Sequence, residues 1–364
     1  MSQPDDRTSF DDRIPTREQI AASLSLEDIH DGLQSMQGLR VAVVGETIID
    51  EYAYCDAIGK SGKEPMIVNR FLRCDAQAGG VLAVANHVAE FCGDVEVVSA
   101  LGTVEPREEF VRQSLRGHVR ASFATITGSP TIVKRRYIDA YSRAKMMGVY
   151  HMDMTPIAGD DERSFLGRLE DALSRCDLCI VTDYGHGLLT PAAVELLTAK
   201  APFLAVNTQL NAANTGYHVL SKYPRADYAC LHEGELRLDA RDLISDLAPL
   251  LERTAVRMGA RAMMATLGKH GTMLWSRGSG IHRCPALADT VVERIGAGDA
   301  VLALSSMAIA AGLEPNIAGI LGNLAGAQMV AVMGNSASIR RATLLASLRE
   351  LTGVPQLRVA GVRP

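Results

Sequence analysis

Short apolar runs alternate along the chain with stretches whose apolar residues follow a helical spacing. The runs end at glycine or polar residues, as expected of strands buried on both faces, and cover residues 39–44, 95–101, 178–182, 203–206, 228–231 and 262–266. The helical stretches are 81–91, 160–174, 191–199 and 239–257. This alternation predicts right-handed crossovers and a mainly parallel sheet that is covered on both faces by helices.

Two stretches, 52–73 and 130–152, depart from this pattern. Apolar residues alternate there with charged ones, as in Thr131-Ile-Val-Lys-Arg-Arg-Tyr, which is typical of strands with one face in solvent. We expect a small accessory sheet over one edge of the main sheet. It would act as a lid on a site, and the alternative is a simple extension of the sheet edge.

Residues 1–38 predict an appended helical arm. Thr16-x-x-Gln19 has the pattern of a capping box, and an apolar stripe with helical spacing follows it. We expect the arm to dock on the body or on a partner subunit. A loosely ordered tail is the alternative.

The composition indicates a globular protein with a large core. Of 364 residues, 47% are hydrophobic and 22% charged, and the net charge is −5 without a block of basic residues. We therefore expect no nucleic acid and no membrane among its partners. The N-terminus lacks the apolar segment of a signal peptide, so we predict a cytoplasmic protein. The uncharged stretch 315–339 contains asparagines and glycines, which favours a buried packing helix over a membrane span.

The most specific local motif is Gly296-Ala297-Gly298-Asp299, directly before an apolar helix predicted at 300–311. Glycines at such a position let backbone N–H groups converge, and the helix N-terminus adds positive potential that stabilises an anion. A carboxylate in the first turn can accept a proton from a hydroxyl. The alternative is an ordinary turn with a helix cap.

Four further motifs accompany it. They are Gly79-Gly80 before the helix at 81–91, Gly45-Glu46-x-x-x-Asp50 after the first strand, Thr266-Leu-Gly268-Lys-His-Gly271 after a buried strand, and Asn323 in a helix at 316–332. Ligands of open parallel sheets bind beyond the carboxyl ends of the strands, where the second and third of these motifs lie. For Gly79-Gly80 the alternative is a tight loop.

Taken in this order, the five motifs resemble the ribokinase-like (PfkB) carbohydrate kinase family from about residue 39 to 349. The first segment, from Val43 to Tyr52, and Asp183-Tyr184-Gly185-His186-Gly187 are most similar to its heptose-7-phosphate kinase branch. The resemblance implies a three-layer αβα sandwich with a β-sheet lid. The kinase domain would cover residues 39–355, with lid strands within 52–73 and 130–152.

The resemblance also implies an ATP-dependent reaction and a role for each matched residue. Asp299 would be the general base, and the N–H groups of Gly296, Ala297 and Gly298 would hold the charge on the transferred phosphoryl group. The sugar site would contain Asp50, Gly79, Gly80, Lys134, Arg136 and Asp183. The nucleotide site would contain His232, Glu235, Thr266, Gly268, Gly271 and Asn323, with Glu235 binding Mg²⁺. Lys134 and Arg136 would reach a substrate phosphate, unless they are solvated strand charges.

The sequence departs from the family at five places. Glu293-Arg294-Ile295 replaces Asp-Thr-x, His232 replaces Asn, Asn207-Thr208-Gln209 replaces Asp-Pro-Lys, His186 replaces Lys, and Ala83 replaces Asn. Glu293 keeps a negative charge, so a monovalent-cation site or a structural role can survive there. These changes indicate an altered substrate pocket around an intact catalytic motif.

We therefore predict a divergent kinase that phosphorylates a sugar or sugar phosphate, similar to heptose 7-phosphate. The alternative is a non-catalytic relative that binds a sugar or a nucleotide and has a scaffolding or regulatory role. A dinucleotide-dependent oxidoreductase is disfavoured, because no Gly-x-Gly-x-x-Gly turn follows the first strand. Lid strands often form the dimer surface in this family, so we expect a homodimer.

Overall fold

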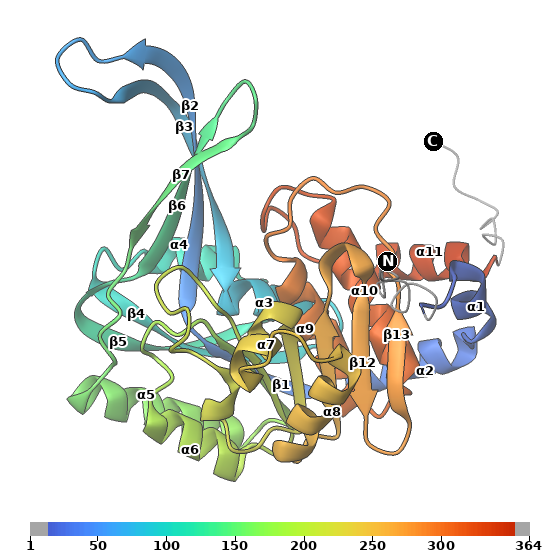
Figure 1. The fold of residues 1–364 in the computed structure, drawn as a ribbon. Coiled ribbons are helices and arrows are strands. Elements are labelled where there is room, and N and C mark those ends of the chain that lie inside the picture. The colour runs from blue at the N-terminus through green and yellow to red at the C-terminus, as the bar shows by residue number, and fades with distance from the viewer. Residues whose placement is uncertain (1–13, 354–364) are drawn as a thin grey trace, which may run out of the picture.

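A large, mainly parallel sheet forms the centre of the molecule in a computed structural model that describes residues 14–353 (Figure 1). Its nine strands lie in the order β13-β12-β11-β10-β9-β8-β1-β4-β5. They are β1 (Arg40–Gly45), β4 (Asp94–Val104), β5 (Arg120–Pro130), β8 (Leu178–Asp183), β9 (Leu204–Thr208), β10 (Tyr228–His232), β11 (Ala262–Thr266), β12 (Thr272–Ser276) and β13 (Gly280–Cys284). Only the pairs β11–β12 and β12–β13 are antiparallel among these neighbours. The predicted α/β fold class is confirmed.

Helices cover both faces of this sheet and make it the middle of three layers. One face carries α3 (Val81–Val88), α9 (Ala297–Ala310), α10 (Pro315–Val330) and α11 (Arg341–Thr352). The other carries α5 (Gly159–Leu173), α6 (Pro191–Lys200), α7 (Glu233–Ala240) and α8 (Leu247–Arg257), and the short α4 (Glu108–Ser114) follows β4. Each face of the sheet has its own hydrophobic core: the first core lies under α3, α9, α10 and α11, and the second lies under α5 to α8. On strand β1, Val41 and Val43 belong to the first core and Ala42 and Val44 to the second, because successive side chains of a strand point to opposite faces.

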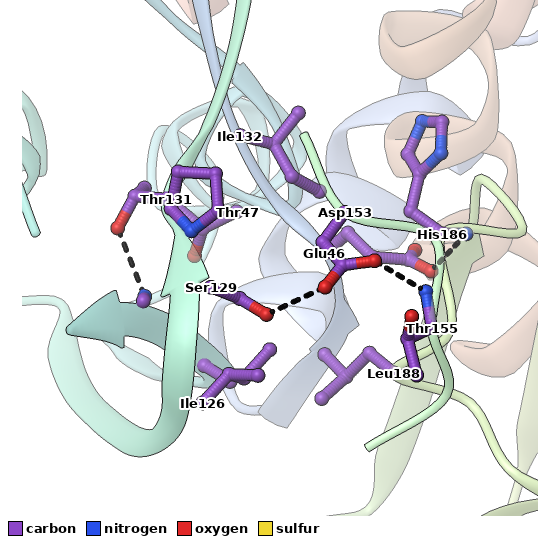
Figure 2. A pocket seen from close by; sticks show the side chains of 13 residues that line it. Glu46, Thr47, Ile126, Ser129, Thr131, Ile132, Asp153, Thr155, His186 and Leu188 are labelled. Atoms are coloured by element: carbon purple, nitrogen blue, oxygen red, sulfur yellow. Dashed lines mark hydrogen bonds between the residues drawn. The ribbon is translucent and has the colours of Figure 1, made fainter. Parts of the chain in front are cut away.

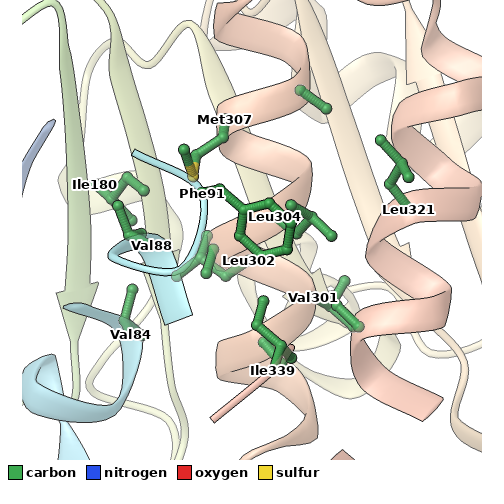
Figure 3. Packing of buried hydrophobic residues seen from close by; sticks show 14 of the residues in the cluster. Val84, Val88, Phe91, Ile180, Val301, Leu302, Leu304, Met307, Leu321 and Ile339 are labelled. Carbon is green, nitrogen blue, oxygen red and sulfur yellow. The ribbon is translucent and has the colours of Figure 1, made fainter. Parts of the chain in front are cut away.

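The first core fixes helix α9 against the sheet. Figure 3 shows Val88 and Phe91 beside Leu304 and Met307 of α9, and Ile180 of strand β8 behind them. These side chains are almost completely buried. The N-terminus of α9 is therefore held rigidly at the carboxyl end of the central strands.

A second sheet rises from the body as a long twisted ribbon (Figure 1). It contains β2 (Thr47–Lys60), β3 (Ile67–Gly80), β6 (Ile132–Asp139) and β7 (Lys145–His151), in the order β3-β2-β6-β7. Strand β2 starts two residues after β1 ends, so this sheet stands at the carboxyl edge of the main sheet. We call this four-stranded sheet the lid.

The prediction of a single helix at 239–257 is wrong. The structure has α7 and α8 instead, separated by residues 241–246. Arg241 is in the left-handed region at φ 51°, and the Asp242 carboxylate accepts the N–H of Ser245, so the chain turns between the two helices. Apolar spacing continues across the break, which explains why the pattern did not reveal it.

The N-terminal arm docks on the body through α1 (Arg17–Ala22) and α2 (Leu26–Gln37). Thr16 and Gln19 form the expected capping box, and Ile29, Leu33 and Met36 are buried in the first core. Residues 1–13 of the predicted arm and the predicted domain end at 355 lie outside the described residues. Between residues 14 and 353, no helix is both long and apolar enough to span a bilayer.

Candidate active site

A cleft of about 270 Å³ opens where the lid meets the carboxyl edge of the main sheet. Three separate parts of the chain supply its walls: the base of the lid, the loop after β8, and the segment leading into α9. The lining residues are Ile48, Asp50, Gly80, Lys134, Arg136, Tyr184, Gln209, Arg294, Ile295, Gly296, Gly298, Asp299 and Asn335. Six of the predicted site residues are therefore brought together here with Asp299.

The glycine motif forms the N-terminus of α9, which is 14 residues long. Gly296 is the N-cap at φ 84°, and a Cβ added there would collide with Asn335 Oδ1. Glycine is therefore required at this position, both for its backbone angle and for the close approach. The Ala297 N–H donates to Arg294 O at 3.4 Å, whereas Gly296, Gly298 and Asp299 line the cleft. N–H groups in the first turn of a helix have no intrahelical acceptor, so those at the cleft can stabilise an anion.

Asp299 lies in the first turn of α9, and the pKa of its carboxyl group is well above the usual value for aspartate. Burial, with smaller effects of Asp50 and Glu235, raises its pKa to about 7, against the opposing effects of Tyr184 and Lys134. The Tyr184 hydroxyl donates to Asp299 Oδ1 at 2.9 Å. A carboxylate with this pKa can both take and release a proton near neutral pH.

Glu46 holds the loop that carries Tyr184. Its two carboxylate oxygens accept the backbone N–H groups of Tyr184 at 2.9 Å and His186 at 3.0 Å. Figure 2 shows Glu46 and His186 among the residues that line a small cavity. Its volume is about 20 Å³. Burial and the nearby Asp183 raise the pKa of Glu46 to about 7. Glu46 thus positions the group that hydrogen-bonds to Asp299.

Asp50 is buried at the base of the lid and anchored on both sides. Its Oδ1 accepts Arg136 Nη1 at 2.6 Å, and its Oδ2 accepts Asn335 Nδ2 at 3.3 Å. A Cβ on Gly79 would collide with the Asp50 carboxylate, so the glycine allows this strand to approach it. Arg136 is thus ion-paired with Asp50. The Asp50 carboxylate still has lone pairs that can accept a hydrogen bond from a ligand hydroxyl.

Lys134 is buried, with 7% of its surface exposed, yet its ammonium has no hydrogen-bond or ion-pair partner in the described part of the chain. The rings of Tyr150 and Tyr184 lie 5.7 and 5.6 Å from Nζ. Burial lowers the pKa of Lys134, and Asp50, Glu46 and Asp299 partly offset that effect. A buried cation without a counter-ion is suited to receive an anionic ligand.

Asp183 does not line the cleft. It is completely buried, and its carboxylate accepts the Tyr223 hydroxyl at 2.6 Å and Lys222 Nζ at 2.5 Å. Gly185 N–H donates to the same carboxylate at 3.1 Å. These contacts indicate that Asp183 has a structural role and fixes the loop that carries Tyr184.

The six predicted nucleotide residues lie outside the cleft lining, at the ends of the neighbouring strands β10 and β11 and on α10. Glu235 accepts the N–H groups of His232 at 2.8 Å and Leu210 at 3.0 Å, and His232 Nδ1 accepts Gly234 N–H, so these two side chains cap α7. Thr266 ends β11, and Gly268 and Gly271 bound the turn after it. Asn323 accepts Leu287 N–H at 3.1 Å and thereby fixes the loop after β13.

Glu235 is the one residue that the sequence predicts as a ligand of Mg²⁺. No group of three or more His, Cys, Asp or Glu side chains between residues 14 and 353 is arranged to hold a metal. Mg²⁺ is commonly bound by one or two carboxylates together with substrate phosphates and water. Glu235 fits that role, because each of its oxygens has a hydrogen bond from only one N–H group.

The structure shows the contacts of Glu293 and His186, two positions at which the sequence departs from the family pattern. Lys145 on the lid forms an ion pair with Glu293 at 2.7 Å, close to the glycine motif. Neither ring nitrogen of His186 has a hydrogen-bond partner, and burial together with the Lys134 charge lowers the pKa of His186 to about 4. His186 is therefore neutral at pH 7, and it lines the small cavity beside Glu46 instead of the cleft.

Sequence reasoning assigned no role to Tyr184, Asn335 or Lys145. Tyr184 stands inside the Asp183–Gly187 segment, and that signal could have identified it. Asn335 and Lys145 come from loops and lid strands, and only the three-dimensional arrangement shows that they reach the cleft.

Most of the chain matches one family of known proteins. Residues 39–342 match the description "pfkB family carbohydrate kinase". The chain is 28% identical over 322 residues to "Bifunctional protein HldE" of Koribacter versatilis, covering 88% of this chain and 65% of that protein. It is 26% identical to the same-named protein of Pseudomonas aeruginosa, covering 88% and 67%. The chain thus spans about two thirds of the length of these relatives.

Solved structures share the fold at low sequence identity. Phosphofructokinase-2 from Escherichia coli in complex with fructose-6-phosphate has a TM-score of 0.69 at 14% identity, covering 86% of this chain and 99% of that one. Ribokinase from Thermotoga maritima has a TM-score of 0.65 at 17% identity, covering 85% and 99%.

Proposed function

Because the chain belongs to the pfkB family of carbohydrate kinases, we propose that it transfers the γ-phosphate of ATP to a hydroxyl of a sugar phosphate similar to heptose 7-phosphate. The observation that carries the proposal is Asp299 at the N-terminus of α9. It combines a pKa of about 7 with a place in a cleft beside free backbone N–H groups and a buried lysine. The heptose-like substrate rests on the resemblance of residues 43–52 and 183–187.

Asp299 acts as the general base in this proposal. It takes the proton of the sugar hydroxyl while that oxygen bonds to the γ-phosphorus, and the bond from phosphorus to the bridging oxygen breaks to release ADP. The proton then leaves Asp299 for water. At neutral pH a pKa of about 7 keeps a large share of Asp299 deprotonated and still basic enough to accept the proton.

The first turn of α9 and Lys134 stabilise the negative charge on the phosphoryl group. The N–H groups of the glycine motif donate to its oxygens, and the helix N-terminus adds to their potential. Lys134 supplies a full positive charge from the lid side of the same cleft. Since its ammonium has no protein counter-ion, an anion arriving there relieves the cost of burial.

Asp50 orients the sugar. Arg136 and Asn335 hold its carboxylate in one direction, so it presents fixed acceptors to sugar hydroxyls at the base of the lid. Glu235 would hold Mg²⁺, which neutralises charge on the nucleotide phosphates when bound. Thr266, Gly268, Gly271 and Asn323 form the wall that approaches the nucleotide.

We also propose that the chain forms a homodimer through the lid. Large apolar side chains are exposed on its strands, among them Ile58, Ile67, Phe71 and Met147, each more than half exposed. Exposed apolar side chains along a projecting sheet favour a protein partner. A second copy of the chain fits best, because it presents the same apolar sheet.

The proposal is tested by ADP release with a panel of heptose and hexose phosphates. Turnover with at least one sugar phosphate supports it. Binding of a sugar phosphate without binding of ATP–Mg²⁺ in calorimetry would favour the non-catalytic alternative instead.

A further inference from the structure

Lys145 connects the lid to the segment that precedes the glycine motif. It is the first residue of β7, and its Nζ lies 2.7 Å from Glu293 Oε2. The Glu293 side chain is only 10% exposed, whereas the Lys145 side chain is 40% exposed. The lysine thus reaches from solvent to a largely buried carboxylate.

Glu293 organises the backbone on either side of itself. Its Oε1 accepts the N–H of Arg294 at 2.9 Å, and its own N–H donates to Val330 O at 3.2 Å. Val292 N–H donates to the same carbonyl at 2.6 Å, at the end of α10. Gly296, the N-cap of α9, follows three residues after Glu293.

The pairing has an electrostatic reason. Burial raises the pKa of Glu293, but the hydrogen bonds from Lys145 and from the Arg294 N–H outweigh it and lower the pKa below its usual value. Removal of Lys145 leaves a poorly solvated carboxylate without a counter-ion, which is costly. The loop is then expected to shift so that Glu293 reaches water.

A second contact joins the lid to the segment that packs against Gly296. Gln77 on β3 accepts Asn335 N–H at 2.7 Å, and its Nε2 donates to Met333 O at 3.4 Å. Asn335 in turn lies against Gly296. The lid therefore touches the surroundings of Gly296 through both contacts, and of these two the Lys145–Glu293 contact is the charge pair.

We infer that Lys145 is a positioning residue: its ammonium, carried on the lid, fixes the backbone geometry of the phosphoryl-binding turn through Glu293. The turn thus has its catalytic geometry when β7 lies against this loop. The inference rests on the proposed kinase function, because it assigns the turn a phosphoryl group to bind.

The kinetic test compares Lys145→Ala and Lys145→Arg with Lys63→Ala, a control lysine near the tip of the lid that has no ion pair in the described chain. In Lys145→Ala, kcat falls about 10- to 100-fold while KM for both substrates changes little, because misplacement of the turn affects mainly the transition state. Lys145→Arg retains most of the turnover. Methylammonium chloride restores part of the lost kcat of Lys145→Ala, and sodium chloride at equal ionic strength does not.

Hydrogen–deuterium exchange separates this inference from the proposed function. Amides of residues 293–298 exchange faster in Lys145→Ala than in wild type or Lys63→Ala, and methylammonium slows them again. Unchanged exchange, or a loss of kcat without rescue, would overturn the role of Lys145. Faster, rescuable exchange in a chain without any turnover would support the coupling and contradict the kinase proposal instead.

Discussion

The Tyr184 hydroxyl donates a 2.9 Å hydrogen bond to Asp299 and so joins the end of β8 to the first turn of α9. Tyr184 and Asp299 are 115 positions apart in the sequence, and the hydrogen bond between them affects the protonation of Asp299. The hydrogen bond favours the ionised form of Asp299 and lowers its pKa, against the larger effect of burial. The balance of these two effects sets the pH at which the base is available.

Replacement of Tyr184 by Phe is expected to move the pH profile. Without the hydroxyl donor the pKa of Asp299 rises from its value of about 7, so less of the carboxylate is ionised at neutral pH. The acid limb of kcat/KM therefore shifts to higher pH, and activity approaches that of wild type at alkaline pH. A profile with an unchanged acid limb, measured from pH 5.5 to 9, would show that Tyr184 does not tune the base.

Lys134→Met is expected to weaken the interaction with the phosphoryl group. The methionine keeps the volume of the side chain and removes the one buried ammonium that has no protein partner in the described chain. We expect kcat/KM to fall by about 100-fold, since a charge-assisted contact contributes about 1.5 to 3 kcal/mol. Lys134→Arg is the matched control and should retain more activity. Equal activity of Lys134→Met and wild type would assign the lysine a structural role only.

Gly296→Ala and Gly298→Ala form a matched pair in one turn. Gly296 is at positive φ and touches Asn335, so alanine there should reduce the free energy of unfolding by about 1 to 3 kcal/mol. Gly298 has no atom within 4 Å of an added Cβ, so alanine there should leave stability unchanged or slightly higher. Urea denaturation measures both variants, and equal stabilities would contradict this account of the turn.

A charged residue on the lid is expected to separate the proposed dimer. Phe71 is 59% exposed on β3, and Phe71→Asp places a charge on the lid surface without disturbing the core. Sedimentation should find wild type at twice the 39.0 kDa chain mass at micromolar concentration and the variant at the chain mass. A wild type that sediments as a 39.0 kDa particle would contradict the dimer.

The sheet and its flanking helices were predictable because their periodicities are strong. The central runs such as 39–44 and 178–182 are uniformly apolar, since helices cover both faces of their strands. The strands β12 and β13 at one end of the main sheet were missed, because they are antiparallel and follow one another through short turns, without the helices that separate parallel strands. The break between α7 and α8 was missed because apolar spacing continues through it.

The site was predictable only as far as its parts are local motifs. The glycine motif and Asp299 lie side by side in the sequence, so their chemistry could be inferred directly. The contacts of Asn335 with Asp50 and of Lys145 with Glu293 join residues 285 and 148 positions apart, and no local pattern encodes them. The same holds for the pKa of Asp299, which depends on burial by distant segments.

The most direct test of the account is the turnover of Asp299→Asn with the best sugar phosphate and ATP. Asparagine keeps the shape and the acceptor for Tyr184 but cannot take a proton, so kcat should fall by about 10²- to 10⁴-fold with ATP binding unchanged in calorimetry. Asp171→Asn on the exposed face of α5 serves as the control and should behave as wild type. Asp299→Asn that turns over at the wild-type rate would contradict the assignment of Asp299 as the base.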